Sequence, residues 1–72
     1  MENKIIEIIS SVSKIDKEEL AEKKEVEKLW ESITHVEIIV SLEEEFDIVF
    51  EQDESASMTT VSKIIDIVNS KV

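Results

Sequence analysis

The sequence predicts an all-α fold, a small bundle of three to four helices with a long first loop. Three segments repeat isoleucine, valine or leucine at spacings of three and four residues, which is the period of an amphipathic helix. The chain has 72 residues, a length that suits one domain over residues 1–72. It contains no cysteine, so it has neither disulfide bridges nor a thiolate nucleophile of its own.

The N-terminal segment predicts a helix from Glu2 to Ser13. Its apolar residues fall at helical spacing with polar residues between them: Ile5, Ile8, Ile9 and Val12. Asp16 followed by Glu19 resembles a capping box, whereas residues 20–29 offer few apolar anchors. We therefore expect a long ordered first loop with one helical turn.

A second long helix is predicted from Ser32 to Phe46. Ser32 is a favoured N-cap residue type, and carboxylates suit the positive end of a helix dipole. The side expected to be buried comprises Ile33, Val36, Ile39 or Val40, Leu42 and Phe46, with Ile38 on its flank. The side expected to face water comprises Glu37, Ser41, Glu44 and Glu45.

The last part of the chain predicts one short helix and one long helix. The polar residues 51–55 could form a single short helix, and residues 60–72 repeat the helical period with Thr59 or Thr60 as the cap. The sequence has no glycine and no proline. Turn positions with positive φ are therefore expected at asparagine, aspartate or serine.

Negative charge is concentrated in one segment. Between Leu29 and Ser62 there is no lysine, and this segment holds nine acids: Glu31, Glu37, Glu43, Glu44, Glu45, Asp47, Glu51, Asp53 and Glu54. Such a surface disfavours nucleic acid and anionic membranes and attracts basic protein patches. A solvated face that keeps the protein soluble is the equally weighted alternative. Because no stretch resembles a signal peptide or a membrane span, we expect a soluble cytoplasmic protein, and a monomer.

Catalysis by the chain itself is not expected. It has one histidine, His35, and no arginine, cysteine or glycine-rich loop. A pairing of Ser32 with His35 three residues later is conceivable, but an ordinary helix residue is the favoured interpretation of this histidine. The acids from Asp47 onward do not match a calcium-binding loop, because positions that need oxygen ligands or glycine hold Val49, Gln52 and Met58. No metal site is predicted.

The bulky apolar residues have two interpretations. Phe46 lies at core spacing, and Trp30 could pack over the first turn of the second long helix. Phe50 and Met58 flank the loop before the last helix, so they could line a small pocket, although a place in the core is favoured. Ser32 also has two interpretations. It could cap the second long helix, or it could carry an attached anion, because the N-terminus of a helix is where an anion is held best.

Three stretches of the chain resemble the acyl carrier proteins, the phosphopantetheine-binding carriers. They are Glu31-Ser32-Ile33 at the start of the second long helix, Leu42-Glu43-Glu44-Glu45-Phe46-Asp47-Ile48 at its end, and Thr59-Thr60-Val61 before the last helix. The resemblance covers essentially the whole chain, and the middle stretch is its most specific part. It implies a bundle of the acyl-carrier type.

The resemblance also implies a function. Ser32 would carry a covalent 4′-phosphopantetheine arm, added by a phosphopantetheinyl transferase, and the thiol of the arm would carry acyl groups as thioesters for fatty acid biosynthesis or related pathways. Partner synthases, ligases and acyl-transferring enzymes with basic patches would contact Glu31, Glu37, Val40, Glu43 and Glu44. An acyl pocket would be lined by Val36, Val40, Phe50 and Met58.

The chain departs from the family pattern around the serine. Glu-Ser-Ile replaces Asp-Ser-Leu, Leu29-Trp30 stands where a glycine is common, and Thr34 replaces an acid. These departures favour a specialised carrier over a housekeeping one. The alternative function is a carrier-like interaction module that is never modified and binds a basic partner through its acidic second long helix.

Overall fold

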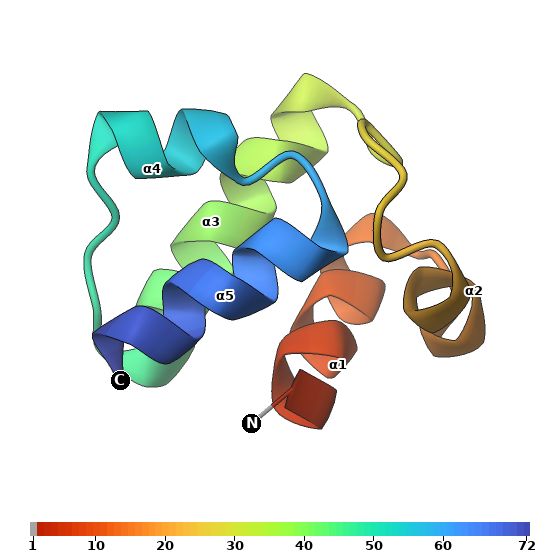
Figure 1. Cartoon of the computed structure of the whole chain (residues 1–72), viewed down its shortest axis with the longest axis horizontal. Helices are drawn as coiled ribbons and strands as arrows, with labels where there is room; N and C mark the ends of the chain where they lie inside the picture. Colours follow the sequence, from red (N-terminus) through yellow and green to blue (C-terminus); the bar gives the residue numbers. More distant parts are fainter. Residues whose placement is uncertain (1) are drawn as a thin grey trace.

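The computed structural model describes residues 2–72, which form five helices and, over this range, no strand (Figure 1). The three long helices are α1 (Glu2–Ser13), α3 (Ser32–Phe46) and α5 (Val61–Lys71). Two short helices, α2 (Lys17–Glu22) and α4 (Gln52–Ser57), lie in the connections between them. The all-α fold class is confirmed. The first loop was expected to contain one helical turn, and in the structure this turn is extended to the six residues of α2.

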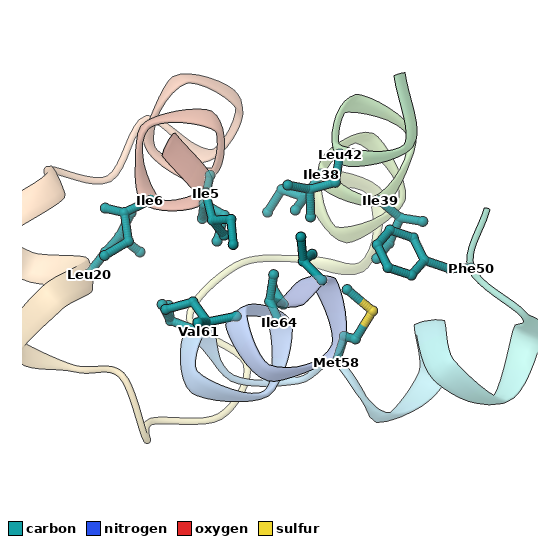
Figure 2. Packing of buried hydrophobic residues seen from close by; sticks show 13 residues of the cluster. Ile5, Ile6, Leu20, Ile38, Ile39, Leu42, Phe50, Met58, Val61 and Ile64 are labelled. Atoms are coloured by element: carbon teal, nitrogen blue, oxygen red, sulfur yellow. The ribbon is translucent and has the colours of Figure 1, made fainter. Parts of the chain in front are cut away.

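The three long helices surround the hydrophobic core (Figure 2). Helix α1 contributes buried isoleucine side chains, the C-terminal α5 contributes buried isoleucine and valine side chains, and α3 packs against α1. The buried apolar residues are Ile5, Ile6, Ile9, Leu20, Ile38, Ile39, Leu42, Phe50, Met58, Val61, Ile64, Ile65 and Val68. Phe50 and Met58 are thus core residues, as the favoured interpretation had it, and Phe46 packs against the edge of the core.

The buried face of α3 differs from the predicted one. Ile38, expected at the flank, is fully buried, whereas Ile33 and Val36 are 76% and 61% exposed. The helix carries apolar residues on most of its circumference, so the period alone did not determine which face would meet α1 and α5. As a result, an apolar stripe of Ile33, Val36 and Val40 lies on the surface of α3.

The chain adopts positive φ at three residues, although it has no glycine. Asp47 ends α3 in the left-handed conformation, and this fits the expectation that aspartate would fill such a position. The other two positions, Lys14 and Lys28, do not fit it. Hydrogen bonds offset their strain of about 1 to 2 kcal/mol. The Lys14 N–H donates within its own helix end to the Ser10 carbonyl at 2.8 Å, and the Lys28 N–H donates to the distant Thr59 carbonyl at 3.2 Å.

The two C-terminal helices are held at their ends by side chains. The Thr60 hydroxyl caps α5 by accepting the Lys63 N–H at 3.1 Å, which confirms one of the two predicted caps. At the start of α4, the Glu54 carboxylate accepts the Glu51 N–H at 2.9 Å. Lys71, at the end of α5, forms an ion pair with the same carboxylate at 2.9 Å.

The stability of the protein should depend on pH because of the carboxyl group of Glu54. The Glu51 N–H, followed by Lys71, lowers the pKa of this carboxyl below its ordinary value of 4.5. The charged form is therefore favoured by folding. Its contribution is complete above pH 4.5 and is lost as the pH falls through the lowered folded pKa. We expect the difference in melting temperature between the wild type and Glu54→Gln to be constant from neutral pH down to that region and then to shrink. A difference that grows on acidification would contradict this.

Candidate functional site

Ser32 is the first residue of α3, so the helix begins where it was predicted, but the N-cap is the residue before it. Glu31 occupies the N-cap position with extended backbone angles, φ −78° and ψ 165°, and its carbonyl accepts the His35 N–H at 2.9 Å. Ser32 therefore does not cap the helix. Its side chain is exposed, and its hydroxyl makes no hydrogen bond with any residue of the range 2–72. This hydroxyl is free for chemical modification.

The backbone around Ser32 favours an attached anion. The first hydrogen bond within α3 is donated by His35, so the N–H groups of Ser32, Ile33 and Thr34 precede the bonded part of the helix. Together with the helix dipole they place partial positive charge beside the hydroxyl. A phosphodiester on Ser32 would meet this charge.

An open hollow of about 740 Å³ lies beside the hydroxyl. Its walls come from three segments that are distant in the sequence: the end of the first loop, the first turns of α3, and the region from α4 to the start of α5. The residues that define it are Lys28, Trp30, Ser32, His35, Val36 and Thr59. Two backbone hydrogen bonds bring the first loop to this place, from Lys28 to Thr59 and from Ser62 to Lys24.

Two side chains and a backbone carbonyl form a chain of hydrogen bonds beside this hollow. The Trp30 indole N–H donates to His35 Nδ1 at 3.1 Å, and His35 Nε2 lies 2.9 Å from the Ser55 carbonyl oxygen. The two rings are nearly parallel, with an angle of 11° between their planes. Trp30 thus packs over the first turns of α3 as expected. Because both nitrogens of His35 are engaged elsewhere, the conceivable Ser32–His35 pair is not formed.

The four residues expected to line an acyl pocket do not lie around one cavity. Val36 lines the hollow beside Ser32. Val40 lines a second hollow, of about 550 Å³, between α3 and α1, to which Val36 also belongs. Phe50 and Met58 are buried in the core and line neither hollow. Burial of these two larger side chains stabilises the core.

The residues expected to bind partners lie mostly on the exposed surface. Glu31, Glu37 and Glu44 are exposed, and Val40 is 45% exposed. Glu43 differs, because its carboxylate accepts the Phe50 backbone N–H at 2.8 Å and so holds the loop between α3 and α4. Glu43 has a structural contact that the sequence did not indicate.

We expect Glu43→Ala to destabilise the protein by about 1 to 3 kcal/mol, because the Phe50 N–H loses a charged acceptor in a partly buried place. Urea denaturation would measure this change. The matched control is Glu44→Ala, whose side chain is exposed, and it should change stability by less than about 0.5 kcal/mol. Equal effects of the two substitutions would show that the contact with Phe50 adds nothing.

In residues 2–72, no group of three or more histidine, aspartate or glutamate side chains is arranged to hold a metal ion. No helix in this range has the length and apolar character needed to cross a bilayer.

Comparison with known proteins identifies the family. No protein-family model matches the chain. The chain is 34% identical over 73 residues to a protein named acyl carrier protein from Buchnera aphidicola subsp. Schizaphis graminum (strain Sg), and the alignment covers 99% of this chain and 92% of that protein. The chain belongs to the acyl carrier protein family. Acyl carrier proteins are carriers and do not themselves catalyse a reaction, so this chain is not an enzyme.

Two structural features near Ser32 were not predicted from the sequence. The contact of His35 with Ser55 joins residues 20 positions apart. Lys28 lines the hollow because its backbone is tied to Thr59. Neither contact leaves a local pattern in the sequence, since each depends on how α4 and the first loop fold over the start of α3.

Proposed function

We propose that this protein carries an acyl or related intermediate as a thioester on a 4′-phosphopantetheine arm attached to Ser32, and that it serves a specialised pathway. The observation that carries the proposal is the exposed Ser32 hydroxyl, which has no hydrogen-bond partner in residues 2–72 and lies at the positive end of α3. Membership of the acyl carrier protein family supports a carrier role in general.

The residues present fit such an arm. The N–H groups at the start of α3 suit its phosphodiester, and the hollow beside Ser32 gives the first part of the arm room to lie against Trp30 and Val36. The arm, when attached, supplies the thiol that forms thioesters, and the chain has no cysteine that could compete for the acyl group. The unusual side chains near Ser32, Trp30 above all, are the reason for proposing a specialised pathway.

Cargo is proposed to contact Val36 first. Val36 belongs to both hollows, so a group that leaves Ser32 can follow the surface from the first hollow toward Val40. Contact with Phe50 and Met58 requires α4 to move away from the core, because both side chains are buried there. A larger cargo would therefore be accommodated at the expense of core packing.

Partner enzymes are proposed to bind the exposed face of α3. Ile33, Val36 and Val40 form an apolar stripe beside the exposed carboxylates of Glu37 and Glu44. A partner with basic residues around an apolar patch would match both features. The phosphopantetheinyl transferase, synthases, ligases and acyl-transferring enzymes are the expected partners.

Reversal of charge at this surface should weaken partner binding. We expect Glu37→Lys and Glu44→Lys each to slow association with a phosphopantetheinyl transferase by roughly tenfold at low salt and to reduce the salt dependence of the rate. Stopped-flow mixing at several salt concentrations would measure this. Glu18→Lys, an exposed change on α2, is the control with the same change in net charge. If it slows association equally, net charge alone matters and the α3 surface is not the binding site.

A loading experiment tests the proposal itself. The purified protein is incubated with coenzyme A and a broad-specificity phosphopantetheinyl transferase, and its intact mass is then measured. The proposal predicts the gain of one phosphopantetheine, located on Ser32 by peptide fragmentation. A gain on another serine would overturn the proposed attachment site.

A further inference from the structure

We propose that His35 is a positioning residue for the Ser32 site: in its neutral form it holds Trp30 as one wall of the hollow, and its protonation releases that wall. The effect of this release on access to Ser32 rests on the proposed function. The pH-dependent contact between Trp30 and His35 is independent of that function. The observations are the hydrogen bonds that join Trp30, His35 and Ser55, and the place of both rings in the wall of the hollow.

The partners of His35 determine its tautomer. An indole N–H can only donate, so His35 Nδ1, at 3.1 Å from it, must be an unprotonated acceptor. The Ser55 carbonyl can only accept, so Nε2, at 2.9 Å from it, must carry the proton. Both contacts are therefore satisfied by a single form of the ring, the neutral imidazole protonated at Nε2.

Protonation of His35 breaks one of these contacts and keeps the other. The second proton is added to Nδ1, which then faces the Trp30 indole N–H as one donor faces another. The hydrogen bond from Nε2 to Ser55 remains and keeps the imidazolium attached to α4. Trp30 is the partner that must move, because it lies in the loop before α3, whereas His35 is fixed within the helix.

The charges around His35 come from several segments. Lys28 from the first loop and Glu31 from the N-cap position line the hollow together with it. Next to Ser55 on α4 lies Glu54, whose carboxylate is bound by the Glu51 N–H and by Lys71 of α5. Glu37 is the nearest acid along α3 and is exposed. The nearest carboxylates thus either face solvent or are already bound. Protonation of His35 therefore acts on the hydrogen bond that Nδ1 accepts from the Trp30 indole.

Release of Trp30 changes access to Ser32. The indole is two residues before the serine and forms part of the same wall. While the ring is held, it limits the space beside Ser32 on one side of the hollow, which Val36 and Thr59 also line. When the ring is released, this side of the hollow opens. Modification of Ser32 should then be faster at a pH at which His35 is protonated.

Spectroscopy tests the contact without any assumption about the arm. Trp30 is the only tryptophan, so its fluorescence reports on this place alone. We expect a one-proton change in emission on acidification, with the helical circular dichroism unchanged. In His35→Asn, whose amide oxygen can accept the indole N–H but does not titrate, the change should be absent. Persistence of the change in that variant would overturn the inference.

Nitrogen chemical shifts of the wild-type ring provide a second measurement that needs no variant. At the alkaline end of the titration they should show the tautomer protonated at Nε2. A ring protonated at Nδ1 would exclude the contact with Trp30 and would overturn the inference even if His35→Asn failed to fold.

Loading kinetics test the effect on access. The rate at which the transferase modifies the wild type is divided by the rate for His35→Asn at each pH, so that the pH dependence of the transferase cancels. This ratio should rise about fivefold between the pH at which His35 is neutral and the pH at which it is protonated, because a hydrogen bond of ordinary strength contributes about that factor. A constant ratio would overturn the access effect. Absence of loading in both proteins at every pH would instead refute the proposed function, and the fluorescence and chemical shifts would still decide the contact.

Discussion

Ser32→Ala is expected to abolish attachment of the phosphopantetheine arm while leaving the fold unchanged. The substitution removes the only atom to which the proposed phosphodiester is linked. It should change stability by less than about 0.5 kcal/mol, because the hydroxyl is exposed and caps nothing. Intact mass after incubation with coenzyme A and a transferase would measure loading, and urea denaturation would measure stability.

The matched control for this experiment is Ser41→Ala. Ser41 lies on the same helix and is also accessible, so the variant should gain the arm at the wild-type rate. If Ser32→Ala still gained one phosphopantetheine, another residue would be the attachment site and the assignment of Ser32 would be wrong.

The largest loss of stability is expected from Leu42→Ala. Leu42 is fully buried where α3 faces the rest of the core, and removal of such a side chain costs about 2 to 5 kcal/mol. A chain of this size has a total stability of roughly 4 to 10 kcal/mol. The variant should therefore lie close to the unfolding threshold at 37 °C, which the midpoint of urea denaturation would show.

Ile33→Ala is the control for Leu42→Ala. It also truncates a large aliphatic residue of α3, but Ile33 is 76% exposed, so stability should change by less than about 0.5 kcal/mol. Because Ile33 belongs to the proposed partner surface, this variant should load more slowly and yet remain fully folded. If both variants lost the same stability, the assignment of the buried face of α3 would be wrong.

The sequence was sufficient to predict the helices but not their orientation. The period of three and four residues located α1, α3 and α5 almost to the residue, because both ends of these helices coincide with a loss of apolar periodicity. The buried face of α3 was predicted correctly at Ile39 and Leu42. It was predicted incorrectly at Ile33, Val36 and Ile38, because all three are apolar and only packing against the other helices distinguishes them. The left-handed lysines, Lys14 and Lys28, were missed, and for Lys28 the reason is that its strain is offset by a hydrogen bond to Thr59 that depends on the fold.

In the candidate site, too, the sequence predicted the feature that has a local pattern but not the features that depend on packing. Ser32 could be chosen from the sequence because it begins a long helix within a stretch that resembles the family. The hollow beside it could not be predicted, since Trp30, His35 and Thr59 come together only when the first loop and α4 fold over the start of α3. Likewise, nothing local marks Glu43 as the acceptor for the Phe50 N–H.

The most direct test of the central claim is the mass of this protein isolated from its native host, with peptide fragmentation around Ser32. The proposed carrier function predicts a phosphodiester-linked phosphopantetheine on Ser32 in at least part of the population. A protein with an unmodified Ser32 throughout would contradict it and would favour the alternative, an interaction module that binds a basic partner through α3 and carries no cargo.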